Sequence, residues 1–448
     1  MKHNNKYERP KIVKQVDGLM NKVGRPALNK PFDKIDNVPV DELISNFGSP
    51  LFVFSERTIR NRLNDAKNTF TIRYPDTVFA WSYKTNYLDA ILSIMHQEGS
   101  LAEVVSEMEY EKARRLGVPG NKIIYNGPCK TRASLERALK EGALIQMDHL
   151  DEIAEVEEIA KSMDFKPSVS LRINLDAGIY PQWNRFGFNL ESGMAIHAVK
   201  RIVLGGILKL TGIHCHIGTF ILDPLAYKRA VEKIIAFEKE LESKFNLKLT
   251  VLNMGGGFAS SNTLMNQYLP GDQAAPSFAQ YADAITAPLL SVQNSYSRKL
   301  ILETGRAIID DAGYLIATVI GTKRLVSGYK SIVIDAGLNL LITALWYKLQ
   351  ILPAQTYEGV VEDTVVYGPL CMNIDCMRDA IPLPDLQKGD KVVIKPVGAY
   401  CVTQSWQFIK LRPAVVLIGA DGSVDLIRRA ETLDDIISAE ILPERFKS

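Results

Sequence analysis

One lysine stands where a long apolar run stops. Lys84 directly follows Thr77–Tyr83, a run without charge and rich in residues that favour strands, so we expect a buried strand that ends at this lysine. A lysine in such a place either caps the strand in solvent or acts as a nucleophile that forms a Schiff base. Because most lysines are simply solvated, the second interpretation needs support from other motifs.

Two histidines and a glycine triplet follow later runs. His214 and His216 are two residues apart, so on a strand their side chains face the same side. A metal pair, two structural histidines and a ring-stacking or acid–base role all fit, although no local partner completes a metal site. The triplet 255–257 is Gly-Gly-Gly, which lets the backbone approach a phosphate and offer N–H donors, as a plain flexible turn also would.

Further polar groups follow other strands. Glu303 and Arg306 end the run 299–303, where they form either a surface ion pair or a clamp that binds phosphate through Arg and a cationic group through Glu. Cys371 lies in a loop with Asp375 four residues later, so a reactive thiol and a small buried hydrophobe are equally plausible. Tyr400 offers a phenol at the end of a later strand.

These residues need elements that bring them together, and the chain alternates apolar runs with amphipathic segments from residue 77 to 303. The apolar runs are 77–83, 101–105, 121–126, 143–148, 168–174, 207–214, 249–254 and 299–303. The helical patterns are 87–97, 106–116, 131–141, 149–162, 190–202, 223–244 and 276–292. Eight strands alternating with seven helices predict an α/β fold, a (β/α)8 TIM barrel whose C-terminal strand ends form the catalytic face.

Beyond residue 310 the pattern changes to strands separated by turn signals, which predicts a β-rich C-terminal domain, a β-barrel or sandwich. The first thirty residues hold eight Lys/Arg against two Asp/Glu and favour a mobile basic arm. We therefore predict four segments: an arm over 1–35, an N-terminal segment over 36–70 that partly joins the β-domain, a barrel over 71–310 and the C-terminal β-domain over 311–448.

Composition excludes several classes of protein. The chain has 448 residues, 46% of them hydrophobic, and a net charge of +2, which fits a two-domain globular protein and gives no reason to expect nucleic acid as a partner. No run of about 18 apolar residues predicts a membrane helix, and the first thirty residues lack the apolar core of a signal peptide. Five scattered cysteines fit the reduced thiols of a cytoplasmic protein.

A lysine, a phosphate cradle, a carboxylate and a stacking histidine on one barrel face suggest pyridoxal 5'-phosphate. Lys84 would hold the cofactor as an aldimine, and the triplet 255–257 would anchor its phosphate. Glu303 would keep the pyridine nitrogen protonated, which makes the ring a strong electron sink.

Taken together, these motifs resemble the fold-type III pyridoxal-phosphate decarboxylases, the family of diaminopimelate, ornithine and arginine decarboxylases. The resemblance covers residues 40–440, with the motifs in the family's order. It implies α-decarboxylation with the Schiff base on Lys84, His216 stacked on the ring, Glu303 at the pyridine nitrogen and Cys371 as the acid that reprotonates the carbanion. The cofactor-binding residues that it implies are Lys84, Glu103, His216, Thr219, Gly256, Gly257, Glu303, Gly305, Arg306 and Tyr400.

The resemblance also implies a homodimer with shared active sites, in which the Cys371 loop of one subunit enters the site of the other. On the substrate side it implies Arg172, Thr343, Tyr347, Met372 and Asp375, with Arg185 bracing the barrel mouth. It implies no metal.

Two departures bear on the substrate. Diaminopimelate decarboxylases resemble one another in an Arg where this chain has Thr343 and a Glu where it has Met372. The chain therefore lacks both side chains that would pair with the charges at the far end of diaminopimelate. This favours the branch of the family that serves siderophore and natural-product biosynthesis. Enzymes of that branch act on amino acids joined to a citrate or a carrier group. The alternatives are a meso-diaminopimelate decarboxylase of lysine biosynthesis and a non-catalytic binding protein of the same fold. An alanine racemase is disfavoured, because it pairs the pyridine nitrogen with Arg.

Overall fold

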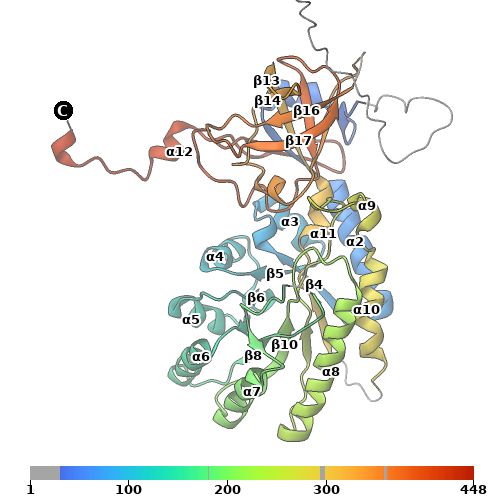
Figure 1. Ribbon diagram of the computed structural model, residues 1–448. Helices are drawn as coiled ribbons and strands as arrows, with labels where there is room; N and C mark the ends of the chain where they lie inside the picture. Colours follow the sequence, from blue (N-terminus) through green and yellow to red (C-terminus); the bar gives the residue numbers. More distant parts are fainter. Residues whose placement is uncertain (1–30, 180, 293–297, 358–360, 448) are drawn as a thin grey trace, which may run out of the picture.

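The computed structural model describes residues 31–179, 181–292, 298–357 and 361–447, and Figure 1 shows a barrel domain below a β-rich domain. Within this part of the chain, eight parallel strands form the barrel, and it closes where β12 pairs with β4 and β10 pairs with β8. This confirms the predicted TIM barrel. The barrel strands are β4 (Thr77–Ser82), β5 (Leu101–Val104), β6 (Ile123–Tyr125), β7 (Leu144–Met147), β8 (Ser168–Asn174), β10 (Lys209–Cys215), β11 (Val251–Asn253) and β12 (Lys299–Leu302).

Helices surround the strands as an outer ring (Figure 1). The ring contains α2 (Glu56–Arg73), α3 (Asp89–Gln97), α4 (Glu107–Arg115), α5 (Arg132–Lys140), α6 (Leu150–Ser162), α7 (Met194–Gly205), α8 (Leu225–Phe245) and α10 (Phe278–Leu290). Local sequence fixes several starts: Ser106 and Thr131 accept N–H groups of α4 and α5, and Ser277 with Gln280 forms a capping box on α10, contacts that satisfy otherwise unpaired donors. Shorter helices are α1 (Val40–Phe47), α9 (Gly271–Ala274) and α11 (Arg306–Ile309).

The second domain is a β-sheet that includes a strand from before the barrel. β3 (Leu51–Ser55) lies between β13 and β19, antiparallel to the first and parallel to the second, and all five of its residues are buried. The other strands are β13 (Gly313–Arg324), β14 (Lys330–Ile334), β15 (Gln350–Pro353), β16 (Glu362–Tyr367), β17 (Cys376–Leu383), β18 (Lys391–Lys395), β19 (Ala414–Ile418) and β20 (Val424–Arg428). The predicted β-rich C-terminal domain is therefore present.

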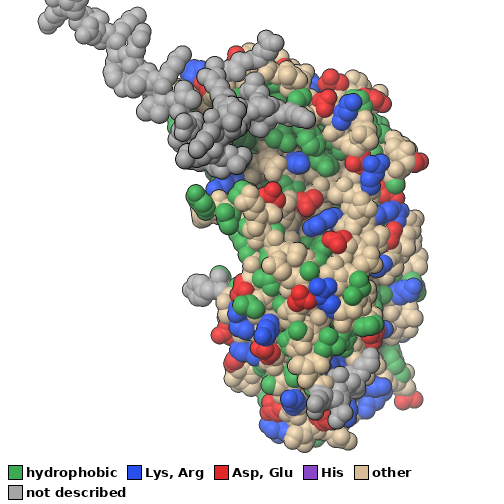
Figure 2. All heavy atoms as spheres, turned by 90° about the vertical axis from the view of Figure 1, so that its right-hand side faces the viewer, with side chains coloured by type: hydrophobic (Ala, Val, Ile, Leu, Met, Phe, Trp, Pro, Cys, Tyr) green, Lys and Arg blue, Asp and Glu red, His purple; other side chains and the backbone are tan. Residues whose placement is uncertain are grey.

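Most of the predicted basic arm, residues 1–30, lies outside the described residues. Its last part is ordered, because Lys34–Ile35 forms β1, which pairs with β2 (Val38–Pro39). Among the described residues, no helix combines the length and apolar character needed to span a bilayer. Figure 2 shows the face that carries α2 and α10, where basic and acidic side chains are interspersed without a large area of one sign.

Candidate active site

The candidate site begins at Lys84, in the short helix η1 (Tyr83–Thr85) that directly follows β4. Lys84 Nζ lies 3.0 Å from Glu103 Oε2 and 3.3 Å from Oε1. Its side chain is 44% exposed, so the amine can be reached from the barrel mouth. Partial burial lowers the pKa of Lys84, but the negative charge of Glu103, followed by Tyr400 and Glu303, raises it by more, so the net shift is upward.

Two buried carboxylates lie behind this lysine. Glu103 is on β5, and Glu303 directly follows β12. The side-chain amide of Asn126, just past β6, donates to both, at 2.8 Å to Glu103 Oε1 and 2.8 Å to Glu303 Oε1. Ser82 also donates to Glu103 Oε2. One amide therefore connects the partner of Lys84 to the second carboxylate across the barrel mouth.

Glu303 has two further partners. Asn253 Nδ2 donates to its Oε1 at 2.6 Å, and His214 Nε2 lies 3.3 Å from its Oε2. Burial alone would raise the pKa of Glu303, but His214, with Lys84 and Asn253, holds that pKa well below its usual range. The carboxylate is therefore ionised at neutral pH.

His216 directly follows β10, and its side chain is partly buried. The Gly256 N–H donates to His216 Nδ1 at 3.1 Å, which assigns the ring proton to Nε2. Burial, with the cations Arg172 and Lys84, holds the pKa of His216 well below its usual range. The imidazole is thus a neutral ring, and Trp183 flanks it at 5.3 Å between ring centroids.

The glycine triplet is required by close approach of neighbouring loops. A Cβ on Gly256 would lie 2.3 Å from the backbone oxygen of Glu303, and one on Gly257 would lie 2.3 Å from that of Gly218. Gly257 also has a φ of +99°, which side chains rarely adopt. The triplet therefore packs the loops after β10, β11 and β12 against one another, beside the exposed Thr219.

Arg306 lies where this cradle meets the β-domain. Its guanidinium is 4.9 Å from the ring centroids of both Tyr347 and Tyr400 and forms a 3.5 Å ion pair with Asp310. Its Nε and Nη1 are buried and have no hydrogen-bond partner in the described part of the chain. Gly305 fits tightly here, since a Cβ would lie 2.1 Å from Thr85 Oγ1. Nη1 is the nitrogen of the Asp310 ion pair, but neither it nor Nε makes a hydrogen bond. Such N–H groups on a buried cation are a place for an anion.

The two arginines expected at the barrel mouth lie beside one aromatic ring. Arg172 is 4.6 Å and Arg185 is 5.0 Å from the ring centroid of Phe186. Arg172 also lies 3.8 Å from Asp148 Oδ1, whereas Arg185 is exposed.

Among the described residues, no hydrogen bond or ion pair joins the loop that holds Cys371 to Lys84. Cys371 is exposed, Met372 is partly buried, and both lie between β16 and β17. Asp375 is buried, and its carboxylate accepts the Leu338 N–H at 2.8 Å and the Leu370 N–H at 2.7 Å, so it braces this loop. Its predicted contact with substrate stays a prediction.

Thr343 lies in a buried polar pair. Its hydroxyl is 3.3 Å from the sulfur of Cys401, and burial raises the pKa of that thiol to about 12. The position therefore holds two neutral groups. Tyr347, four residues later, reaches Arg306 with its ring.

Two buried residues of this network, Asn126 and Asn253, were not among the predicted site residues, and a third, His214, was a candidate whose role the sequence left open. Each lies at or just past the end of a barrel strand, as Lys84 and Glu303 do. These residues could therefore have been found by the same rule that pointed to Lys84 and Glu303, namely a polar residue at the end of a barrel strand. Here the polar residue is an asparagine or a second histidine.

The comparisons with known proteins agree with this geometry. Residues 56–310 match the sequence model of the pyridoxal-dependent decarboxylases, pyridoxal binding domain. The chain belongs to this decarboxylase family. The decarboxylase is 31% identical over 422 residues to the diaminopimelate decarboxylase of Aquifex aeolicus, covering 91% of this chain and 95% of the relative. It is 30% identical over 432 residues to that of Methanocaldococcus jannaschii, again with 91% and 95% covered.

Solved structures give the same result. The crystal structure of the M. jannaschii diaminopimelate decarboxylase matches with a TM-score of 0.85 at 30% identity, covering 92% of this chain and 97% of that one. A lysine/ornithine decarboxylase of Vibrio vulnificus shares the fold, with a TM-score of 0.71 at 21% identity, covering 85% of this chain and 97% of that one. The resemblance expected from the motifs is confirmed, and the enzyme is a pyridoxal-phosphate-dependent carboxy-lyase.

The residues present fit the cofactor of this decarboxylase family, pyridoxal 5'-phosphate. An accessible lysine suits its aldehyde, and the two Arg306 nitrogens that make no hydrogen bond, Nε and Nη1, suit its phosphate. The ionised Glu303 suits a protonated ring nitrogen. Within the described residues, no group of three or more His, Cys, Asp or Glu side chains is placed to hold a metal ion.

Proposed function

We propose that this decarboxylase removes the α-carboxylate of an amino acid at the site formed by Lys84, Glu103, His216 and Glu303. The observation that supports these roles is the Asn126 bridge, which connects the carboxylate beside Lys84 to the ionised carboxylate on the other side of the barrel mouth. We propose meso-diaminopimelate as the first substrate, because relatives about 30% identical over nine-tenths of the chain carry that name.

When bound, the cofactor withdraws the electron pair left on the α-carbon as CO2 departs. Glu303, ionised because of its low pKa, would keep a proton on the ring nitrogen. His216, neutral because of its own low pKa, would lie against the ring without adding a competing charge. Arg306 would hold the phosphate with the N–H groups of Nε and Nη1, which make no hydrogen bond to the described residues.

Cys371 would return a proton to the α-carbon, from a loop that a second subunit would contribute. Lys84 pairs with Glu103 at the barrel mouth, whereas Cys371 is exposed in the loop between β16 and β17 of the β-domain. We therefore propose a homodimer in which each Cys371 loop serves the site of its partner. In that dimer, the exposed Cys371 thiol of one subunit would donate a proton in the active site of the other subunit.

A second candidate substrate is an amino acid joined to a larger uncharged or carrier group. Thr343 and Cys401 form a neutral buried pair where diaminopimelate decarboxylases resemble one another in an arginine, and Met372 replaces a glutamate. A distal ammonium and carboxylate without partners in a closed site would cost about 2–5 kcal/mol. None of the relatives described above is named for a siderophore or natural-product pathway, so this candidate stands second.

CO2 release from a panel of substrates separates the candidates. The panel contains meso-diaminopimelate, lysine, ornithine, arginine and a citryl–diaminopropionate conjugate, with Lys84→Ala as the inactive control. A kcat/KM at least about tenfold higher for diaminopimelate than for the others is expected from the first candidate. Preference for the conjugate would reverse the order, and no CO2 from any amino acid would contradict the decarboxylase assignment of this site.

A paired variant tests the distal positions. Thr343→Arg combined with Met372→Glu introduces the two charges that the diaminopimelate enzymes share. If these positions contact the distal end, the variant gains activity on diaminopimelate and loses activity on the conjugate. Equal activity of wild type and variant on both substrates would show that neither position contacts the distal end.

The cofactor role of Lys84 has a spectroscopic test. The visible absorbance band of the lysine–cofactor adduct should be present in the wild type and absent in Lys84→Ala. Lys112→Ala, which removes a lysine that pairs with Asp89 on the outer surface, is the control and should keep the band. If the band is still present in Lys84→Ala, another lysine forms the adduct with the cofactor.

A further inference from the structure

Asp310 is a buried carboxylate to which the proposed function assigns no role. It begins the short helix η3 (Asp310–Ala312), directly after α11 (Arg306–Ile309), and is 1% exposed. It lies four positions after Arg306, so the two side chains share one face of this helical turn, and Arg306 Nη1 is 3.5 Å from Asp310 Oδ2. Because a carboxylate is rarely buried unless it has partners, the contacts of Asp310 show what it does.

Neighbouring loops hold the Asp310 carboxylate in place. Ser260 Oγ and Asn262 Nδ2, from the loop after β11, both donate to Oδ2, the second at 2.7 Å. The Ala399 N–H of the β-domain donates to Oδ1 at 3.2 Å. Both carboxylate oxygens therefore accept hydrogen bonds, and the side chain cannot turn without breaking one of them. Asp310 is thus a carboxylate fixed beside Arg306.

The contact with Asp310 gives Arg306 an orientation but leaves its N–H groups available. The rings of Phe220, Tyr347 and Tyr400 surround the guanidinium, with centroids at 5.8, 4.9 and 4.9 Å. Ring faces attract a cation but do not determine where its N–H groups point. Nη1 pairs with Asp310 without a hydrogen bond, and Nε also makes none with the described residues. Both nitrogens therefore remain able to bind an anion.

Asp310 also holds the segment that carries Tyr400. Its backbone oxygen accepts the Gly398 N–H at 3.1 Å, and its side chain accepts the Ala399 N–H. Tyr400, the next residue, has a φ of +66°, a conformation that persists only when neighbouring contacts support it. Two residues expected to bind the cofactor, Arg306 and Tyr400, thus lie next to contacts made by one carboxylate.

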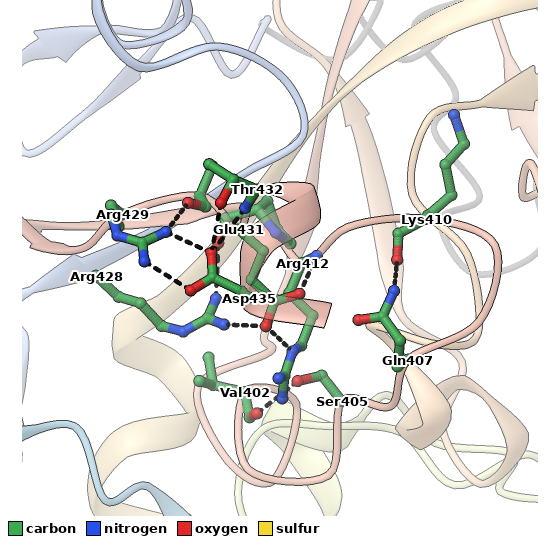
Figure 3. Close-up of polar contacts among 12 residues, drawn as sticks. Val402, Ser405, Gln407, Lys410, Arg412, Arg428, Arg429, Glu431, Thr432 and Asp435 are labelled. Atoms are coloured by element: carbon green, nitrogen blue, oxygen red, sulfur yellow. Dashed lines mark hydrogen bonds and ion pairs between the residues drawn. The ribbon is translucent and has the colours of Figure 1, made fainter. Parts of the chain in front are cut away.

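This segment continues as a loop over residues 400–412, which is anchored separately at its far end. Figure 3 shows Glu431 accepting the Arg412 N–H at 2.8 Å and Arg428 Nη2 at 2.9 Å. The Glu431 side chain is only 6% exposed. A substitution of Glu431 would therefore loosen the same loop and leave the ion pair of Arg306 in place, which provides a control.

We propose that Asp310 is a positioning residue for the cofactor phosphate, because it orients the guanidinium of Arg306 and the backbone that carries Tyr400. The inference rests on the proposed function, which takes Arg306 as a phosphate-binding residue. Asp310 acts through these two residues and does not itself bind the phosphate. A negative charge near a phosphate weakens binding by itself, so the gain from Asp310 comes from the orientation of its neighbours.

The affinity that the phosphate group adds tests the proposal. Full-length protein freed of cofactor is titrated with pyridoxal phosphate and with pyridoxal, which lacks the phosphate. We define the phosphate factor as the dissociation constant of pyridoxal divided by that of pyridoxal phosphate. Asp310→Asn keeps the shape of the side chain and removes its charge. It should lower the phosphate factor about tenfold or more and change the affinity for pyridoxal less than about twofold.

Two controls separate positioning from a general loosening of the region. Asp311→Asn removes the neighbouring carboxylate, which accepts from Ser261 and lies 3.9 Å from Arg62. Glu431→Gln weakens the far anchor of the loop over residues 400–412. Both variants should keep the phosphate factor of wild type. A fall as large as that of Asp310→Asn in either control would contradict a specific role of Asp310.

A second variant and a double variant test the route of the effect. Asp310→Glu keeps the charge but displaces it by one methylene group, so it should lower the phosphate factor as well. Arg306→Ala should lower the factor by itself, and Asp310→Asn added to it should lower the factor by much less than in wild type, because the residue through which Asp310 mainly acts is gone. A full additional loss in the double variant would show that Asp310 acts by another route.

The remaining outcomes overturn the proposal in distinguishable ways. An unchanged phosphate factor in Asp310→Asn and Asp310→Glu, with CO2 release retained, would remove the positioning role and leave the proposed function standing. A higher factor in Asp310→Asn would show that Asp310 only repels the phosphate. Equal losses of affinity for both compounds would show a general structural role. Wild-type protein that releases no CO2 from any amino acid would instead contradict the proposed function itself.

Discussion

Asn126 and Glu303 lie at the ends of strands that are not neighbours in the barrel, yet the Asn126 amide is 2.8 Å from Glu303 Oε1. The same nitrogen is 2.8 Å from Glu103 Oε1. Both carboxylates thus share one neutral donor, in addition to Ser82 and Lys84 on Glu103 and Asn253 on Glu303. The side-chain carbonyl oxygen of Asn126 has no hydrogen-bond partner among the described residues. The orientation of both carboxylates depends on this residue.

Replacing Asn126 should therefore disturb both carboxylates at once. Asn126→Ala leaves two buried oxygens short of a donor, a loss of about 1–3 kcal/mol, and we expect cofactor affinity to fall about tenfold or more. Asn126→Asp should be worse, because a third carboxylate beside two others raises their pKa values. Titration of the apoenzyme with pyridoxal phosphate, followed by absorbance across pH, measures both effects. Ser82→Ala, which removes a donor to Glu103 only, is the control and should leave the pH dependence of Glu303 unchanged.

Gly256→Ala should damage the cradle through its backbone. The added Cβ would lie 2.3 Å from the Glu303 backbone oxygen, so one of the two loops must move. We expect a loss of about 1–3 kcal/mol in the free energy of unfolding together with weaker cofactor binding. Gly321→Ala is the matched control, since nothing lies within 4 Å of its Cβ position. Equal stability of the two variants in urea would contradict the close approach.

Mixing two inactive variants tests the shared site. Lys84→Ala and Cys371→Ala subunits, exchanged at random, give one complete site in half of the dimers, so about a quarter of wild-type activity should return. A site built within one chain would show no recovery despite proven exchange. Cys129→Ala, which removes another exposed thiol, should remain active by itself.

Glu109 should make the enzyme less stable as pH rises. Burial, opposed in part by the Val105 N–H, raises the pKa of Glu109 to about 7, whereas an unfolded chain has a value of about 4.3. Between these values the folded state binds more protons, so the free energy of unfolding falls with rising pH, by about 1–3 kcal/mol. Urea midpoints at about pH 5 and pH 8 should therefore differ less in Glu109→Gln than in wild type. In the control Glu107→Gln, at an exposed position, the difference between the two urea midpoints should equal that of wild type. If Glu109→Gln also shows the wild-type difference, the prediction is refuted.

The barrel was predictable because its strands lie in short runs rich in apolar residues that alternate with amphipathic segments. The run 77–83 became β4 (Thr77–Ser82), and 168–174 coincides with β8. Strands β15 and β17 were not predicted, since the first ends in Pro353 and the second mixes charges and a proline into its sequence. Those strands depend on pairing with β18 and β16, which a local pattern cannot reveal.

Some residues of the candidate site were likewise predictable from the sequence, and others were not. Strand-end position alone pointed to Lys84 and Glu303, because a charge after an apolar run is conspicuous. Asn126 and Asn253 have the same position, but an amide there reads as an ordinary loop residue. Asn126 matters because it reaches Glu303 across the barrel mouth, and Asn253 because its strand pairs with the one that ends at Glu303. Both contacts depend on how the strands assemble rather than on sequence spacing.

The central place of β3 has a consequence for the synthesis of this protein. Because β3 (Leu51–Ser55) lies between β13 and β19, the β-domain is built from both ends of the chain, with the barrel inserted between them. All barrel strands are synthesised before β19, so the barrel can fold first. Until β13 and β19 are synthesised, the apolar side chains of β3 lack their partners in the sheet. A fragment that begins at residue 311 would lack its middle strand, and it should be soluble only when residues 51–55 are supplied with it.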